Sequence, residues 1–287
     1  MADQFPQELP ENLLQTKSKT SKITAKPTTN ELRLSVFGKK VEAENVFKNR
    51  LISQTKFVPF QNGLTAIDEF PFEIWSRITN RIIRNPKRNL LGYGDAAGYF
   101  PLREAIAKHL TSARGVNCTA EQVFITSGAQ QALYLAAGIF LERGDSIVIE
   151  EPCYLEARNV FSANDAKIIS VEVDNEGLNA ANIPSDNKIK LAYVTPSHQY
   201  PLGVTMSLSR RLALLEWAKK NNAWIIEDDY NSEYRYAGRP LASLQGLDRN
   251  GRVIYVGTFS KTIFPSLRLG CLVVPPELVA VFTAARA

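Results

Sequence analysis

Residues 258–270 read TFSKTIFPSLRLG and lie between two apolar runs, 253–256 and 271–274. Each run has the length and composition of a buried strand, so this stretch begins at a strand end. A lysine placed there is costly unless its charge is neutralised or bonded. Arg268 adds a second cation seven residues after Lys261, with no carboxylate between them. The pair favours a bound anion and a reactive amine, and a phosphorylated aldehyde joined to Lys261 as a Schiff base meets both demands.

The composition is that of an ordinary soluble globular protein. The chain has 287 residues, of which 45% are hydrophobic and 22% charged, enough for one or two domains and a large core. No apolar run is long enough to span a membrane, and the N-terminus lacks a basic-then-apolar signal pattern. The three cysteines show no metal-ligand spacing, so no metal site is expected. We therefore expect a cytoplasmic protein with free thiols and no membrane partner.

The positive charge is concentrated near the N-terminus. The net charge is +5, and residues 1–60 hold ten Lys and Arg against six Asp and Glu. Residues 16–30 are rich in Thr, Ser and Lys and show little apolar periodicity, which is typical of a linker. We predict a linker or N-terminal extension over residues 1–56 and a folded domain over residues 57–287.

The predicted domain alternates strands with helices. Pro101 stands at a first-turn position of an amphipathic helix, and Ser207 precedes another helix as a candidate N-cap. Helices are expected at 70–84, 101–113, 130–141, 155–162 and 209–220, and strands at 122–126, 146–149, 167–173, 190–194, 223–226, 253–256 and 271–274. This alternation favours an α/β fold with a mostly parallel central sheet and helices on both faces. Ligands of such sheets bind beyond the carboxyl ends of the strands.

Polar motifs follow several of these strands. Ser127 or Gly128 would cap a helix after the strand at 122–126, where the helix's first N–H groups could hold a phosphate. Tyr154 follows the next strand and could lie flat over an aromatic cofactor. Residues 195–203, TPSHQYPLG, could supply hydrogen bonds to a phenolic oxygen, and residues 227–229 place three acids after a strand. A carboxylate aimed at a pyridine nitrogen would keep that nitrogen protonated.

In combination these motifs resemble fold-type I pyridoxal-phosphate (PLP) enzymes of the class I/II aminotransferase superfamily. Within that superfamily they resemble the aminotransferase-like domain of MocR-type regulators of the GntR family. The segments that carry the resemblance are GYGDAAGYFPLREAIAKHL (92–110), TSGAQQAL (126–133), TPSHQYPLG (195–203), IIEDDYNSEYRY (225–236) and GTFSKTIFPSLRLG (257–270). The resemblance covers about residue 57 to the end, and the preceding segment resembles the interdomain linker of that group.

The resemblance implies a role for individual residues in catalysis. Lys261 would be the Schiff-base lysine, and Tyr230 would bond the phenolic oxygen of the cofactor. Asp228 would pair with the pyridine nitrogen, with its neighbour Asp229 as the rival for that role. Tyr154 would stack on the ring.

Further residues are implied to bind the cofactor. His198 and Tyr200 occupy the loop where classical aminotransferases place an asparagine, which leaves the contact at that point open. Tyr93 matches the tyrosine that reaches the phosphate of a neighbouring subunit, which implies a homodimer. The residues expected around the phosphate are Gly128, Ala129, Thr258 or Ser260, and Arg268.

The resemblance also predicts that two parts of the family's architecture are missing. A winged-helix module would precede this chain, so DNA binding is expected only through a module absent from it. The chain ends inside a helix that starts after Pro275-Pro276, and the small C-terminal domain of the family is expected to be missing.

Three functions remain open from the sequence. The first is a PLP-binding domain of a transcriptional regulator that senses PLP or an amine or amino-acid effector. The second is a PLP-dependent aminotransferase that moves an amino group from an amino acid to a 2-oxo acid. The third is a non-functional truncated remnant.

Overall fold

The computed structural model describes residues 33–43, 65–85, 91–234 and 242–287. The chain divides into two units, Met1–Leu34 and Ser35–Ala287, and every described helix and strand lies in the second. Most of the expected linker, and the expected start of the domain at residue 57, fall outside the described residues. The helices of four or more residues are α1 (Val36–Ala43), α2 (Phe72–Arg84), α3 (Phe100–Arg114), α4 (Ala129–Phe140), α5 (Leu155–Ala163), α6 (Leu208–Lys220), α7 (Leu244–Leu247) and α8 (Val279–Arg286).

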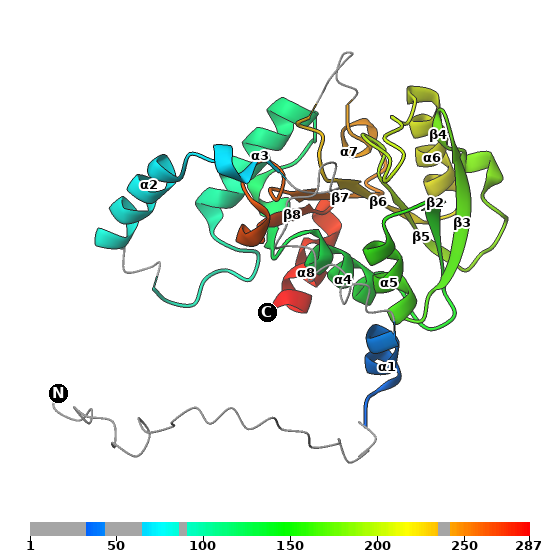
Figure 1. Cartoon of the computed structure of the whole chain (residues 1–287). Coiled ribbons are helices and arrows are strands. Elements are labelled where there is room, and N and C mark those ends of the chain that lie inside the picture. Colours follow the sequence, from blue (N-terminus) through cyan, green and yellow to red (C-terminus); the bar gives the residue numbers. More distant parts are fainter. Residues whose placement is uncertain (1–32, 44–64, 86–90, 235–241) are drawn as a thin grey trace, which may run out of the picture. The chain divides into compact units, whose positions relative to one another are not determined.

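A single sheet of eight strands runs through the second unit (Figure 1). Its strands are β1 (Val123–Thr126), β2 (Ser146–Glu151), β3 (Lys167–Asp174), β4 (Gly177–Leu178), β5 (Ile189–Val194), β6 (Trp224–Asp229), β7 (Val253–Thr258) and β8 (Gly270–Val273). They lie in the order β1-β8-β7-β6-β5-β2-β3-β4. All neighbours pair in parallel except at β8 and β4, which run antiparallel to theirs. The expected mostly parallel α/β sheet is therefore confirmed.

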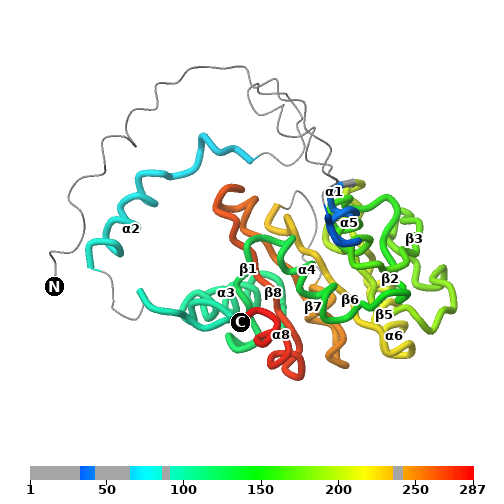
Figure 2. Tube along the Cα trace, turned by 90° about the horizontal axis from the view of Figure 1, so that it is seen from below, coloured from blue at the N-terminus to red at the C-terminus, as the bar shows by residue number. Residues whose placement is uncertain are grey.

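Helices cover both faces of the sheet. On one face α4, α5 and α8 bury a core that includes Phe161, Ile226 and Phe282, and Figure 2 shows these three helices on the same side. On the other face α6 and α7 pack against Val148, Ile225 and their neighbours, and α3 packs against the end of the sheet formed by β1, β8 and β7. Burial of large apolar side chains on both faces is the main source of stability in this architecture.

Local signals explain most element boundaries. Ser207 is the N-cap of α6, as expected, and its hydroxyl accepts a bond from the Arg210 N–H at 3.4 Å. Gly128 is the N-cap of α4 but no side chain caps that helix. α8 begins shortly after Pro276, as expected. β6 continues three residues beyond its expected end, so all three acids of residues 227–229 belong to the strand.

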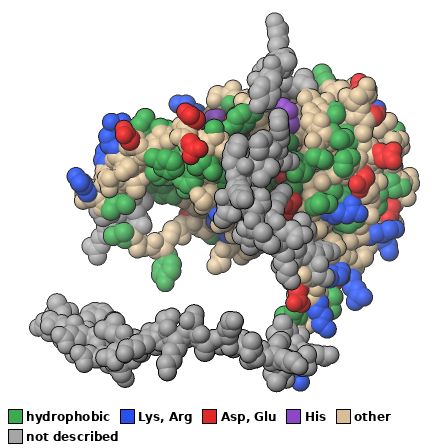
Figure 3. Space-filling model, viewed as in Figure 1, with side chains coloured by type: hydrophobic (Ala, Val, Ile, Leu, Met, Phe, Trp, Pro, Cys, Tyr) green, Lys and Arg blue, Asp and Glu red, His purple; other side chains and the backbone are tan. Residues whose placement is uncertain are grey.

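Two helices lie outside the alternating pattern. α1 falls inside the range assigned to the linker, and its Lys40 pairs with Asp165 after α5 while Phe37 contacts Tyr134 of α4 edge-on. α2 has no buried residue. Figure 3, viewed as Figure 1, shows hydrophobic side chains in green among charged ones in the region of α2. The exposed apolar side chains of α2 are Phe72, Ile74, Trp75, Ile78, Ile82 and Ile83. Several exposed apolar side chains on one helix are typical of a contact area.

Candidate cofactor site

The register of the sheet brings four strand ends together. Thr126 at the end of β1 pairs with Gly270 at the start of β8, and Gly270 pairs with Thr258 at the end of β7. The next residue back in β7, Gly257, pairs with Asp229 at the end of β6. The segments that follow these ends hold most of the predicted site residues. The motifs that follow β1, β6 and β7 therefore begin at one edge of the sheet.

Successive side chains of β6 point to opposite faces of the sheet, which separates the neighbouring acids. Glu227 and Asp229 share one face, and Asp228 points to the other. All three carboxylates are buried, with at most 3% of each residue exposed. Burial of three carboxylates is costly unless each finds donors or a cation.

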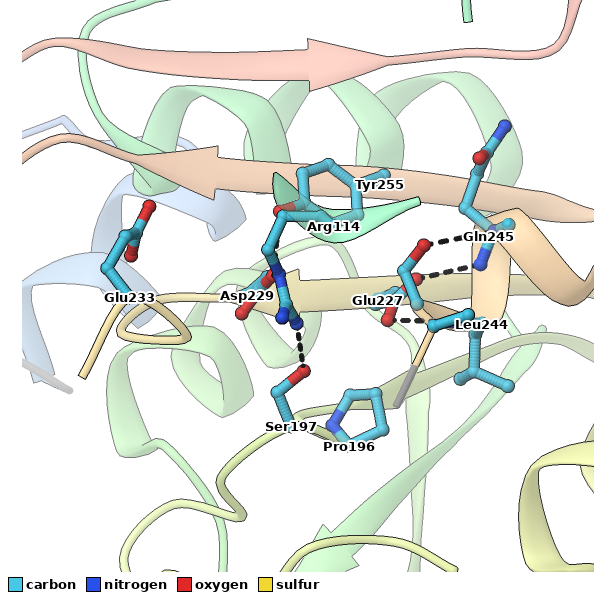
Figure 4. Close-up of polar contacts among 12 residues, drawn as sticks. Arg114, Pro196, Ser197, Glu227, Asp229, Glu233, Leu244, Gln245 and Tyr255 are labelled. Carbon is cyan, nitrogen blue, oxygen red and sulfur yellow. Dashed lines mark hydrogen bonds and ion pairs between the residues drawn. The ribbon is translucent and has the colours of Figure 1, made fainter. Parts of the chain in front are cut away.

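Asp229 pairs with an arginine from a distant helix (Figure 4), while its Oδ1, like that of Asp228, is buried without a hydrogen-bond partner among the described residues. Its Oδ2 accepts from Arg114 Nε and from the Tyr255 hydroxyl, both at 2.7 Å. Arg114 is the last residue of α3, and its Nη2 also donates to Ser197 Oγ at 2.7 Å. The ion pair neutralises Asp229 inside the protein, and it ties β6 to the loop after β5.

Glu227 is held by backbone donors on the same face. The N–H groups of Leu244 and Gln245, at the start of α7, each donate to it at 2.9 Å. Burial raises the pKa of Glu227 to about 7 against the opposing influence of these donors and of Arg211. Arg211 is itself buried and donates to three backbone carbonyls, including Pro196 O at 2.7 Å.

Asp228 has no cation among the described residues. The Tyr193 hydroxyl donates to its Oδ2 at 2.8 Å, and its Oδ1 is buried without a hydrogen-bond partner. Burial raises the pKa of Asp228 to about 7, and the charge of Asp229 adds to the rise. A buried carboxylate oxygen with no partner in the described part of the chain can accept from a cationic or N–H donor.

Three tyrosines form a row beside Asp228. Tyr200 contacts Tyr154 edge-on at a centroid distance of 5.5 Å and Tyr230 at 5.7 Å. Burial raises the pKa of the Tyr230 hydroxyl to about 12, and the charge of Asp228 contributes to the rise. Tyr230 is therefore a neutral hydrogen-bond donor at ordinary pH.

Two of the expected phosphate residues, Gly128 and Arg268, lie against each other at the start of α4. Gly128 has a φ of 78°, and a Cβ on it would lie 2.7 Å from Arg268 Nη2. A Cβ on Gly270 would lie 2.8 Å from the Gly128 carbonyl carbon. The glycines allow the Arg268 guanidinium to lie directly against the turn before Ala129, where the helix offers its first N–H groups.

The turn that carries Lys261 is held by its own hydroxyls. Ser260 N donates to Thr258 Oγ1 at 3.2 Å, and the two hydroxyl oxygens are 3.0 Å apart. The Tyr234 hydroxyl donates to the Lys261 carbonyl at 2.6 Å. Lys261 is half-buried, so its amine is neither fully desolvated nor fully exposed.

Two predicted residues stand apart from this group or on its border. Tyr93 is fully exposed at 109%, and among the described residues no hydrogen bond or ring contact joins it to another site residue. His198 is half-buried and lies between Ser197, which Arg114 binds, and the buried Gln199. The predicted contact of Tyr93 with a partner subunit, and the role of His198, stay predictions.

The domain model "Aminotransferase class I and II" matches residues 65–287, which is more than half of the chain. The chain belongs to the class I and II aminotransferase family. The fold-level resemblance inferred from the five motifs is thereby confirmed.

Curated relatives of this aminotransferase-family chain include both regulators and enzymes. It is 44% identical over 223 residues to "Probable rhizopine catabolism regulatory protein MocR" of Rhizobium meliloti, a match that covers 77% of this chain and 45% of that protein. It is 34% identical over 238 residues to "Aromatic-amino-acid aminotransferase 1" of Thermococcus litoralis, covering 80% of this chain and 57% of that protein. The chain thus spans about half the length of these relatives.

Solved aminotransferases share the fold of this family member. Kynurenine aminotransferase from Pyrococcus horikoshii, solved in complex with PMP, is 34% identical and superposes with a TM-score of 0.75 over 89% of this chain and 63% of that one. LysN, an alpha-aminoadipate aminotransferase from Thermus thermophilus, is 30% identical with a TM-score of 0.77, covering 88% and 66%. LysN was solved with N-(5'-phosphopyridoxyl)-L-leucine.

Sequence reasoning missed the side chains that support the family site. Tyr193 and Arg114 were not singled out because they lie in none of the motifs, and Gln199 was not singled out although it lies in the motif at 195–203. Tyr193 lies in an apolar strand, where a tyrosine is expected to be a core residue. Arg114 lies 115 residues from its partner Asp229. The three acids of residues 227–229 were the available signal, since each buried acid requires a partner.

Among the described residues, no helix is both long and apolar enough to cross a membrane.

Proposed function

We propose that this chain binds pyridoxal phosphate as the effector-sensing domain of a MocR-type transcriptional regulator. The observation that carries the cofactor assignment is the buried Oδ1 of Asp228, which has no hydrogen-bond partner and no cation near it in the described part of the chain. A protonated pyridine nitrogen supplies both. The choice between the two acids favours Asp228, because Arg114 already neutralises Asp229.

The phosphate end of the site fits the same cofactor. Arg268 lies against Gly128, beside the first N–H groups of α4, and Ser260 and Thr258 add hydroxyls on the neighbouring turn. A guanidinium and helix N–H groups together are a strong phosphate site.

The residues divide the work at the ring between them. When bound, pyridoxal phosphate supplies an aldehyde that condenses with amines and a ring that draws electrons from the bonds of the amine's α-carbon. Lys261 provides the amine that anchors the aldehyde and can carry a proton to and from the α-carbon. Asp228 keeps the ring nitrogen protonated, Tyr230 donates to the phenolic oxygen, and Tyr154 covers the ring face.

The regulator assignment rests on the relatives. Identity to the Rhizobium meliloti regulator is 44%, against 34% for the Thermococcus litoralis aminotransferase. In this proposal DNA is contacted by a winged-helix module outside this chain, and the signal is PLP or its adduct with an amine or amino acid. The exposed apolar side chains of α2 and the exposed Tyr93 support a homodimer, in which Tyr93 reaches the partner's phosphate.

The second candidate is an aminotransferase, which the same ring-binding residues and the archaeal relatives support. Turnover separates the two. The purified protein, loaded with PLP, is mixed with single amino acids and 2-oxoglutarate, and glutamate is counted per site. A sensor gives a saturable spectral change with at most about one equivalent of product. Many equivalents would overturn the sensing proposal in favour of the enzyme, and failure to bind PLP would overturn both.

A further inference from the structure

Gln199 is a buried amide at the centre of the loop between β5 and α6. Only 1% of the residue is exposed. Its Nε2 donates to Pro152 O at 2.7 Å and to Tyr200 O at 2.8 Å, with Glu150 Oε2 farther away at 3.4 Å. Its Oε1 accepts from Leu202 N at 3.1 Å. Both ends of the amide are therefore used, and nothing in that arrangement is left for a ligand.

These bonds join the two turns that carry the tyrosine row. Pro152 precedes Tyr154 by two residues, and Tyr200 follows Gln199 directly. The Tyr154 and Tyr200 rings meet at an interplanar angle of 77°, and Tyr200 meets Tyr230 at 82°. Edge-on contacts of this kind depend on ring orientation, so they are sensitive to a shift of either turn.

A second buried contact fixes the same loop from the other side. Glu150 Oε2 accepts from Thr195 N at 3.0 Å and from Thr195 Oγ1 at 2.7 Å. Thr195 Oγ1 in turn accepts from Tyr200 N at 3.0 Å. The backbone of Tyr200 is thus bonded on both its N–H and its carbonyl, and the carbonyl bond belongs to Gln199.

We infer that Gln199 is a positioning residue, which holds Tyr154 and Tyr200 at the spacing that receives the cofactor ring. The inference rests on the proposed PLP site. Gln199 does not touch the ring in this account, and it acts through the two tyrosines on either side. Replacing it should therefore weaken PLP binding only while those tyrosines are present.

The test is a double-mutant cycle on PLP affinity, measured by absorbance titration of the purified chain. Gln199→Met removes the amide while preserving the length of the side chain, and we expect it to raise the Kd about tenfold, the effect of a lost buried hydrogen bond. In a Tyr154→Ala, Tyr200→Ala background the same replacement should change the Kd less than about twofold. Gln122→Met is the matched control, because Gln122 bonds Val274 O at 3.0 Å away from the tyrosines.

The outcomes separate failure of the proposed function from failure of the positioning role of Gln199. If the wild-type chain binds no PLP, the proposed function fails. If it binds PLP and Gln199→Met is as tight as wild type, or is equally weakened in both backgrounds, the positioning role fails. If Gln199→Met does not fold, Gln199→Asn takes its place, since its amide is one methylene too short to reach both carbonyls. A normal Kd for that variant would also overturn the role.

Discussion

Replacing Asp228 with asparagine should stabilise the cofactor-free protein above neutral pH. The carboxyl has a pKa of about 7 in the folded state against an ordinary value of 3.8, because it is buried. Because the folded pKa is raised, the folded state holds the proton more tightly than the unfolded state. Stability is then present at low pH and is lost as pH rises from the unfolded pKa through the folded pKa.

The size of the effect follows from the two pKa values. They differ by about three units, and one unit corresponds to about 1.4 kcal/mol, so ionised Asp228 costs the apoprotein up to about 4 kcal/mol. Asparagine keeps the acceptor for the Tyr193 hydroxyl and removes the charge. Glu227 also has a raised pKa of about 7, but it titrates in both proteins and cancels in the comparison. The pKa of Glu150 is raised to about 7 by burial and in part by the charge of Asp228, so removing that charge adds to the gain.

The assay is urea unfolding of the two apoproteins, followed by tryptophan fluorescence at about pH 5 and about pH 8. The gain from Asp228→Asn should be about 2 kcal/mol at the lower pH, which already lies above the unfolded pKa, and approach about 4 kcal/mol at the higher one. Asp229→Asn is the matched control with the opposite sign, because it leaves Arg114 buried without its partner and should cost about 3–5 kcal/mol. Equal signs for the two variants, or no gain from Asp228→Asn at pH 8, would refute the reasoning.

Three further predictions concern the bound state and the assembly. Arg268→Ala should weaken PLP binding at least tenfold in an absorbance titration, because the phosphate loses charge-assisted bonds, while the exposed Arg249→Ala should leave the Kd unchanged. Gly128→Ala should lower both PLP affinity and the midpoint of thermal unfolding, since the φ of Gly128 is 78° and the new methyl would lie 2.7 Å from Arg268 Nη2. An unchanged Kd would contradict phosphate binding between Gly128 and Arg268. Tyr93→Ala should weaken PLP binding without changing monomer stability. A mixed dimer of one Tyr93→Ala subunit and one Lys261→Ala subunit, isolated with two affinity tags, should retain one intact site. Full affinity of Tyr93→Ala would argue against a contact across subunits.

The strands could be predicted from the sequence because an apolar run with polar flanks is a local pattern that does not depend on tertiary contacts. The runs 253–256 and 271–274 were each correct to within two residues. The direction of β8 could not be predicted, because a short apolar run does not encode whether its neighbour is parallel. The extension of β6 to Asp229 was also missed, since acids at a strand end ordinarily indicate a solvated turn.

Support for the candidate site depends on residues far apart in sequence. Asp229 is buried beside Arg114, which comes from α3. Asp228 has no such cation among the described residues, because the pleat of the strand points its side chain to the other face, where it accepts from Tyr193. Neither fact is visible in the run of three acids. The position of α1 also depends on a contact between distant residues, since Lys40 pairs with Asp165 more than a hundred residues later in the chain. The chemical types at the site were predictable, but the partners that distinguish neighbouring residues were not.

The central claim is that Lys261 holds pyridoxal phosphate in this site. The most direct measurement is the visible absorption spectrum of the purified chain with added PLP, followed by borohydride reduction and mass analysis of its peptides. We expect a long-wavelength band that borohydride abolishes, with the cofactor then fixed to the peptide containing Lys261 and absent from Lys261→Ala. No band in a folded protein, or an equal label in Lys261→Ala, would contradict it.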